Sequence, residues 1–270
     1  MPSCINCNAE VTTAYCPACG QPNPPKKISI RNVWSDFVSR TYGFDGMFPR
    51  TITDLTIRPG TAAKAYIEGN RVRYYGPIGY FFLMITVYLL LASILGVDMI
   101  DYTLKSNPFG VDPAQGKNAI NNDINNWVIE NFRLISFFIA LFSIFYAWLF
   151  FRKSGYNIVE TSAIVFYSNG HVIWFSILFL LIYVFTGNVV NGVFSFWLAI
   201  GFQFYSYVNF YTHQHWFKVL IKSIFGFILS FFSFFVLGIV VAIIVMLTND
   251  NVREKWINQQ KVKIEQTVPK

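Results

Sequence analysis

The residues of this chain that could do chemistry lie at its N-terminus, where four cysteines form two Cys-x2-Cys pairs. The pairs are Cys4 with Cys7 and Cys16 with Cys19, and the 270-residue sequence has no other cysteine. Four thiolates can hold Zn²⁺ in a tetrahedron with bonds of about 2.3 Å. Two intervening residues let both sulfurs of a pair face inward from one tight loop. We therefore expect a zinc ribbon over residues 1–21.

The residues beside the cysteines suit such loops. Asn8 follows the first pair and Gly20 follows the second, and both residue types tolerate the left-handed backbone that these positions need. Val11 and Tyr15 are candidates to pack over the metal. Two disulfides or a redox pair are the alternatives, and a cytoplasmic location disfavours disulfides. Whether the metal is structural or sensory stays open.

The rest of the chain has the composition of a membrane protein. It is 54% hydrophobic, 19% aromatic and only 13% charged, far from a soluble domain. Apolar runs of about twenty residues cross a bilayer as helices. Five runs predict an all-α polytopic bundle over residues 77–247: 77–97, 132–151, 161–186, 189–211 and 219–247. The fourth is the weakest, because it is rich in Ser, Gln and Tyr.

Charge predicts the orientation of these spans. Nine Lys or Arg residues precede the first span, whereas the loop after it is acidic. By the positive-inside rule we expect a multi-pass protein of a bacterial cytoplasmic (inner) membrane, with a cytoplasmic N-terminus and no cleavable signal peptide. Five spans place the polar tail, residues 248–270, outside. That tail carries five Lys or Arg residues, so its side stays open.

Residues 22–76 form a basic linker with short amphipathic helices. The first apolar stripe is Ile30, Val33, Trp34, Phe37 and Val38, and a weaker one is Phe48, Ile52 and Leu55. Arg58-Pro59-Gly60 breaks the pattern, after which Thr61 is expected to cap a third helix that stops at Gly69. These helices either dock on the anionic inner leaflet or pack against the bundle.

Two arginines and several polar groups in the spans are candidate sites. Arg71 and Arg73 suit a lipid phosphate, but they could equally pair with Glu68 or set topology. A polar seam, serving as a path for a proton or small solute, would use Glu160, Asn169, His171, Gln203 and Asn209. The alternative is hydrogen bonding that holds the bundle together. His213 and His215 make a poor metal pair, because positions i and i+2 do not share a helix face.

Three motifs carry a family resemblance. Cys16-Pro-Ala-Cys-Gly-Gln21, Arg58-Pro-Gly60 and Tyr66-Ile-Glu-Gly-Asn-Arg71, with Tyr74 and Pro77, resemble a bacterial family catalogued as a domain of unknown function (number 3667). That family combines a zinc ribbon with a multi-span membrane region. The first cysteine pair departs from its pattern, with Asn8 where glycine is usual. The resemblance implies this architecture and no reaction.

The sequence favours a binding role over catalysis. It contains no nucleophile–base pair, phosphate loop or HExxH motif, so we do not expect an enzyme. We expect a membrane scaffold or adaptor whose zinc ribbon recruits a cytosolic protein partner. The alternative is a small-solute or proton transporter or channel regulated by the ribbon. Topology and anionic lipid explain the net charge of +7, so we expect no nucleic-acid partner. The ligand, the partner and the oligomeric state are not predicted.

Overall fold

The structure, a computed structural model, describes residues 3–24, 47–106 and 130–248. Within these ranges the chain is all-helical and forms no strand, only two isolated β-bridges near the N-terminus. The stripe from Ile30 to Val38 and nearly all of the polar tail lie outside the described residues. The elements are α2 (Met47–Ile57), α3 (Pro59–Ile67), α4 (Pro77–Ile94), α5 (Met99–Lys105), α8 (Phe132–Phe151), η1 (Arg152–Ser154), α9 (Ile158–Thr186), α10 (Gly192–Phe210) and α11 (Trp216–Thr248).

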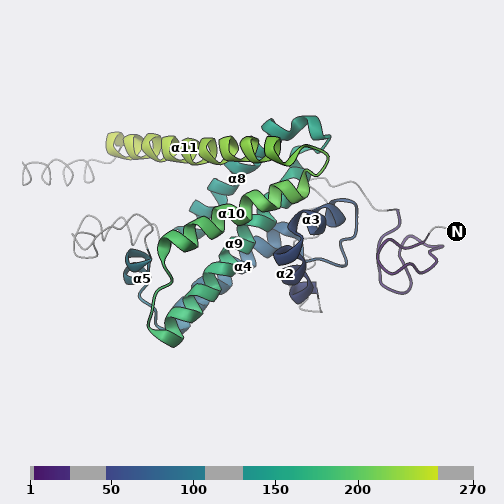
Figure 1. Cartoon of the computed structure of the whole chain (residues 1–270), viewed down its shortest axis with the longest axis horizontal. Helices are drawn as coiled ribbons and strands as arrows, with labels where there is room; N and C mark the ends of the chain where they lie inside the picture. The colour runs from purple at the N-terminus through teal and green to yellow at the C-terminus, as the bar shows by residue number, and fades with distance from the viewer. Residues whose placement is uncertain (1–2, 25–46, 107–129, 249–270) are drawn as a thin grey trace, which may run out of the picture.

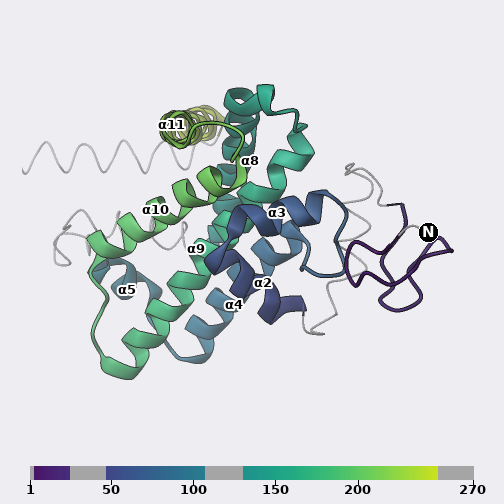
Figure 2. The same ribbon diagram turned by 45° about the vertical axis from the view of Figure 1, so that its right-hand side comes forward.

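The centre of the bundle is the pair α4 and α9, which lie side by side along their length (Figure 1). Helices α8 and α10 flank α9, and α11 packs on α8 and α10. In Figure 2 α11 is seen nearly end-on while α9 and α10 are seen from the side, so α11 crosses them at a steep angle. Helices α2 and α3 cover one end of α9.

Four helices of the described ranges are long and apolar enough to cross a membrane: α4, α8, α9 and α11. The fourth expected span, which corresponds to α10, is not among them, because its Ser, Gln and Tyr residues dilute its apolar character. Its 19 residues nevertheless extend about 28 Å. Short connections join it to α9 and α11, so α10 also runs the length of the bundle.

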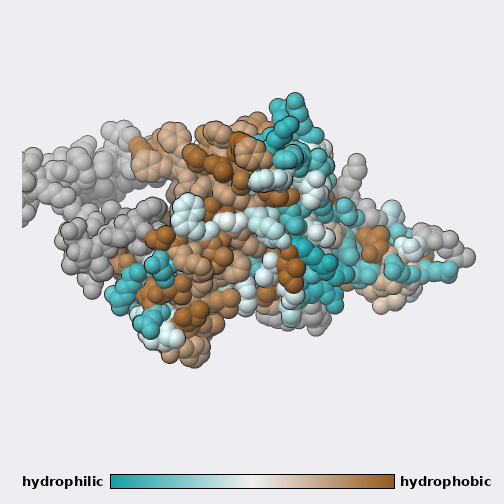
Figure 3. Space-filling view, viewed as in Figure 1, coloured by the Kyte–Doolittle hydropathy of each residue, from teal (hydrophilic) through white to brown (hydrophobic). Residues whose placement is uncertain are grey.

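One end of the molecule is polar and the remaining surface is mostly apolar (Figure 3). The polar end carries α2, α3, the α8–α9 connection and the α10–α11 connection. Brown, hydrophobic surface covers α11 and the middle of the bundle. We call α2, α3 and residues 68–76 the collar. This division is what a membrane body with a polar cap requires.

A capping box moves the start of α9. The Asn157 side chain accepts a hydrogen bond from the Glu160 backbone N–H at 2.8 Å, and the Glu160 carboxylate accepts one from the Asn157 N–H at 2.9 Å. This motif satisfies two end groups of the helix. The helix therefore begins at Ile158, before residue 161, and Glu160 lies at its capped end.

The collar helix α3 also begins earlier than the sequence suggested. Pro59 occupies its first turn, Arg58 is the N-cap residue, and Thr61 makes no cap, so the expected role of Thr61 is wrong. Proline suits this position because its missing N–H would be unpaired anyway. At Gly60 the backbone of α3 touches that of α10: a Cβ there would overlap Asn209 and Phe210.

The same kind of close approach joins α9 to α4. A Cβ on Gly170 would lie 2.9 Å from the Tyr80 ring and 3.1 Å from the Cα of Phe81. Tyr80 and Tyr167 are fully buried between these helices. The Tyr167 hydroxyl donates to the Tyr75 carbonyl at 2.6 Å, which ties α9 to the collar.

Candidate metal centre and the collar that carries it

The four cysteines converge on one point. Their sulfur atoms all lie within 4.8 Å of one another, and Cys4 Sγ to Cys19 Sγ and Cys7 Sγ to Cys16 Sγ are both 3.6 Å. A tetrahedron with metal–sulfur bonds of about 2.3 Å has edges of about 3.8 Å, whereas a disulfide needs about 2.05 Å. The cysteines are free thiols. Their spacing fits a four-coordinate thiophilic ion.

Two equivalent loops build this cage. In the first the Asn8 N–H donates to the Cys4 carbonyl at 2.9 Å, and in the second the Gly20 N–H donates to the Cys16 carbonyl at 2.8 Å. Asn8 has φ 59° and Gly20 has φ 70°, which confirms the left-handed conformation expected at both. Val11 is buried against the cage as expected. Tyr15 is 62% exposed, so its expected packing is wrong.

One thiol of the cage ionises readily. The pKa of Cys19 is lowered to about 6, chiefly by a hydrogen bond from the Asn6 side chain. A thiolate is the form that binds metal, and the remaining thiols must lose their protons as an ion enters. Metal binding to this centre is therefore coupled to proton release.

A glutamine docks the cysteine knuckle on the collar. The Gln21 side-chain amide donates a hydrogen bond to the Gly69 carbonyl, and Gln21 is 2% exposed. The Gln21 carbonyl accepts from the Cys16 N–H at 2.7 Å, so the same residue closes the second cysteine loop. The knuckle is thus held at the polar end of the bundle (Figure 1).

A buried carboxylate organises the collar. Asp54 accepts from Arg58 Nη2 at 3.0 Å and from the Tyr74 hydroxyl at 2.8 Å, and Arg73 Nη2 lies 3.6 Å away. Burial favours a higher pKa for Asp54. The Tyr74 hydrogen bond and the Arg58 guanidinium outweigh it and hold that pKa below its usual value. Asp54 is therefore charged and locks α2 to the 68–76 connection.

Both arginines proposed for lipid phosphate make contacts inside the collar. Arg73 approaches Asp54, as above, and its guanidinium lies 5.6 Å from the Tyr74 ring. Arg71 is 8% exposed, with its guanidinium 5.9 Å from the Tyr66 ring. Cation–π contact of this kind is favourable for arginine.

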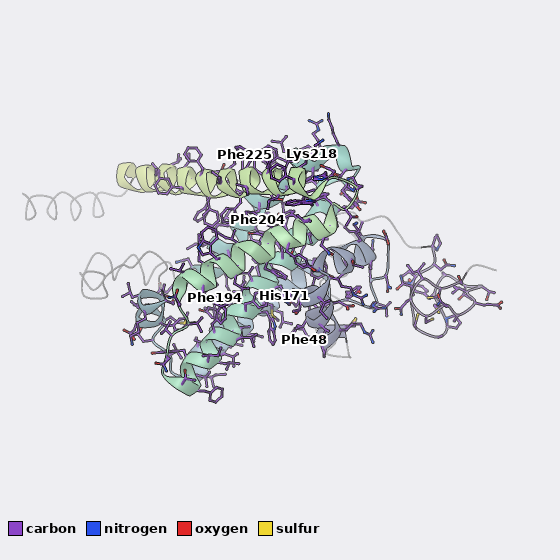
Figure 4. All side chains as sticks on the ribbon, in the orientation of Figure 1. Phe48, His171, Phe194, Phe204, Lys218 and Phe225 are labelled. Atoms are coloured by element: carbon purple, nitrogen blue, oxygen red, sulfur yellow. The ribbon has the colours of Figure 1, made fainter. Side chains whose placement is uncertain are left out.

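His171 is sealed between the collar and two spans. It is fully buried in the middle of the bundle (Figure 4), with Nδ1 2.9 Å from the Tyr80 hydroxyl and Nε2 3.0 Å from Thr56 Oγ1. Thr56 gives its hydroxyl proton to the Ile52 carbonyl at 2.8 Å. It must then accept from His171, which assigns the proton to Nε2 and leaves Nδ1 to accept from Tyr80. Both ring nitrogens are therefore hydrogen-bonded.

The other seam residues do not join His171. Asn169 faces α10, where Gln203 Nε2 lies 3.4 Å from its Oδ1. These two amides line a cavity of about 190 Å³ between α8, α9, α10 and α11. Asn209 lies beside the collar at Gly60, and Glu160 caps α9. The five polar residues therefore fall into four separate places.

The histidines after α10 also lie apart from any metal-ligand cluster among the described residues. His213 is exposed beside the Tyr211 ring. His215 Nδ1 accepts from the Phe217 N–H at 3.3 Å, at the start of α11. This geometry suits a helix N-terminus.

Sequence reasoning missed the Asp54 cluster and the Thr51 contact, in which Thr51 Oγ1 accepts from the Tyr75 N–H at 2.9 Å. A signal was present: an acid at position 54 next to the buried Leu55 of an apolar stripe, four residues before Arg58. A carboxylate on a buried face needs a donor nearby. The apolar stripe alone predicts a face that docks on lipid or packs against the bundle, and it does not predict a carboxylate cluster.

Comparison with known proteins returns one family. No curated protein and no solved structure matches the chain. The matching stretch contains α2, α3, residues 68–76 and most of α4, which is the collar and the entry into the bundle. Residues 45–89 match the family described as "Protein of unknown function (DUF3667)".

Proposed function

We propose that this integral membrane protein is an adaptor, whose metal-bearing knuckle recruits a cytosolic protein to the bilayer. The observation that carries the proposal is the exposure of two large apolar side chains on a docked knuckle. Ile5 is 50% exposed and Tyr15 is 62% exposed. Tyrosine is enriched among the residues that dominate binding energy at interfaces.

The attachment of the knuckle supports this role. The bond from the Gln21 amide to the Gly69 carbonyl tethers the knuckle to the collar, so the exposed Tyr15 lies on a tethered knuckle and not on a free tail. A partner binding there loses less conformational freedom than one binding a free tail. In this proposal the collar holds the knuckle, and the spans hold the protein in the membrane.

Site-specific crosslinking tests the adaptor role. A photoreactive phenylalanine at position 15 should trap one protein in intact cells, and the same residue at the exposed position 12 should not trap it. Tyr15→Ser should remove that protein from pull-downs of the full chain, while Thr12→Ser should retain it. Identical adducts at both positions would argue against a Tyr15 interface.

The metal is proposed to be zinc, held by Cys4, Cys7, Cys16 and Cys19 at one ion per chain. Elemental analysis of the purified full chain should give that ratio, and Cys16→Ser should lose the ion without losing the helical circular dichroism of the spans. Cys16 is buried in the knuckle and touches no span. Retention of zinc by Cys16→Ser would contradict the four-thiolate site.

The proposed location is the cytoplasmic membrane of a bacterium, with the knuckle inside. Nine basic residues before the first span support this orientation. A membrane-impermeant maleimide should label Cys7, which is exposed, only after the cells are opened and the metal is removed with a chelator. Labelling in intact, chelator-treated cells would show that the knuckle lies outside.

A second candidate, transport of a proton or small solute, is favoured by the cavity at Asn169 and Gln203. Polar groups at membrane depth often mark a path. Proteoliposomes with a pH-sensitive dye inside should report proton flux that Gln203→Leu abolishes. A proton flux equal to that of empty liposomes would exclude proton transport.

A further inference from the structure

Three lysines gather near the connections that join α8 to α9 and α10 to α11: Lys153, Lys218 and Lys222. Lys153 and Lys218 are exposed, and they are the charged groups whose fields act on Lys222. Figure 4 places Lys218 at the polar end of α11. In the part of the chain that the structure describes, no carboxylate forms an ion pair with any of the three. Among the described residues, the positive charge of the lysine cluster therefore has no ion-pair partner.

The residues around this cluster are of the types found at the lipid headgroups. Trp216 and Phe217 are exposed beside it, and Arg152 lies 5.8 Å from the Trp148 ring. Tryptophan and basic residues together mark the membrane interface. Lys222 is six residues further along α11 than Trp216, which is about 9 Å toward the apolar body. A charge at that depth is costly without a counter-ion.

Lys222 is held in place by neutral partners. Its Nζ donates to Gln214 Oε1 at 2.9 Å and lies 5.2 Å from the Phe151 ring. Gln214 in turn donates to Ser154 Oγ at 2.8 Å. This chain of contacts joins the two connections and fixes the amine over the space between α8 and α11, but it brings no negative charge.

Beneath Lys222 runs a groove between α8, α10 and α11. Its walls include Ser143 and Ala147 of α8, Tyr207 of α10, and Ser223 and Gly226 of α11. Gln203, Ser143 and Phe227 line both this groove and the cavity of about 190 Å³ deeper in the bundle. Phe204 lies between α10 and α11 (Figure 4). The groove itself is shallow, with a volume of about 20 Å³, and it shares a wall with the deeper cavity.

We propose that this site binds one anionic phospholipid, with its phosphate at Lys153, Lys218 and Lys222 and one acyl chain lying over the shallow groove between α8, α10 and α11. Charge complementarity identifies the headgroup, because three lysines without an ion-pair partner among the described residues meet a phosphate that carries the opposite charge. The exposed apolar side chains of Phe225 and Phe232, further along α11, identify the chain.

Native mass spectrometry of the full chain in detergent tests the headgroup. We expect retention of dioleoylphosphatidylglycerol but not of dioleoylphosphatidylcholine. Lys222→Gln should weaken retention at least about tenfold, and the control Arg50→Gln, which removes an exposed collar charge, by at most about fivefold. Equal loss in both variants, or equal retention of both lipids, would overturn the site.

The acyl chain is tested on the same helix. Gly226→Leu fills the groove and keeps every lysine, whereas Gly238→Leu meets open space. Only Gly226→Leu should release the lipid. On the unchanged protein, dihexanoylphosphatidylglycerol should bind much more weakly than the dioleoyl form, a comparison that needs no folded variant. Displacement of the lipid by millimolar inorganic phosphate, with no dependence on chain length, would overturn the lipid in favour of a soluble phosphate.

Discussion

The collar and α11 are two regions held in opposite ways. In the collar Leu55, Ala62 and Ala63 are fully buried, and the charge of Asp54 is paired. In α11 only 17% of the candidate span is buried inside the protein, compared with 44% in α4. The collar takes its conformation from the chain's own contacts. Helix α11 relies on what surrounds it.

This difference in packing follows from the surroundings of each region, which are lipid for α11 and water for the collar. Exposed side chains on α11 are large and apolar, including Phe225, Ile228, Phe232 and Phe235, and lipid tails accept them without cost. A helix in lipid also satisfies its own backbone. The collar must instead exclude water with short helices, which need tertiary packing to be stable. Substitutions in the collar should therefore cost more than those on α11.

Gly60→Ala should have the largest effect. The added Cβ would overlap the backbone of Asn209 and Phe210, so α3 would have to move away from α10. Overpacking against a backbone costs about 3 kcal/mol. We expect a marked fall in the thermal unfolding temperature of the full chain in detergent.

Gly226→Ala is the matched control on α11. The nearest atoms to its new Cβ would be 3.6 Å away, in ordinary contact with Phe150. Alanine also has the higher helix propensity, so the change should be within about 1 kcal/mol. Equal losses at positions 60 and 226 would erase the contrast between collar and α11.

Asp54→Asn should come next, at about 2 kcal/mol. The change leaves Arg58, Arg73 and the Tyr74 hydroxyl around a neutral group, and charged hydrogen bonds of this kind contribute about 1.5–3 kcal/mol. Asp101→Asn, in an exposed helical pair with Lys105, is the control and should be nearly silent. Chemical unfolding in detergent measures both.

The Asp54 effect should depend on pH in one direction. Its pKa is lowered in the folded protein, so its stabilisation is present above the unfolded value of about 3.9 and is lost as pH falls through the folded value. Asp54→Asn should therefore be less stable than the unchanged chain at pH 7 but approach it at about pH 3. A difference that grows on acidification would contradict the assignment.

Thr56→Val should cost about 1 kcal/mol, because it leaves the His171 Nε2–H without its acceptor. Thr53→Val is the control. Thr53 makes the same bond to the carbonyl four residues earlier, at 3.0 Å, but among the described residues its hydroxyl does not bond to a histidine. Nitrogen-15 chemical shifts of the His171 ring should show the Nε2–H tautomer in the unchanged chain. Equal stability of the two variants would remove this link between collar and bundle.

Gln21→Ala should have the smallest effect on the global stability of the chain, because the lost bond acts only at the contact between knuckle and collar. It removes the bond to the Gly69 carbonyl, worth about 1 kcal/mol. Hydrogen exchange in a peptide over residues 66–76 should speed up about fivefold, while zinc content stays unchanged. Glu10→Ala, exposed on the knuckle, should leave that exchange as it was.

Local patterns predicted the features that depend on neighbours in sequence. Cysteine spacing gave the cage, and Asn8 and Gly20 gave its left-handed turns. Apolar runs located the long helices, because length and hydropathy are properties of each segment alone. The capping box at Asn157 was also readable in the sequence, although the expected span began later.

Contacts between distant segments were not predictable. His171 meets Tyr80 and Thr56 across 91 and 115 residues of sequence. Nothing local distinguishes a paired histidine from one that lines a path, so the five seam residues read as one group. Likewise the sequence made Tyr15 a candidate to pack over the metal, because the apolar character of a side chain alone does not say which face of the knuckle that side chain occupies.

Helix α11 has one more consequence, which concerns thickness. Its 33 residues extend about 50 Å, well beyond the hydrocarbon core of about 30 Å. A helix of that length fits within the bilayer only if it tilts far from the membrane normal, or if the bilayer thickens around it. Because α11 crosses α9 and α10 at a steep angle (Figure 2), these helices cannot all stand along the membrane normal at once. The length of α11 therefore makes the molecule sensitive to the thickness of its membrane.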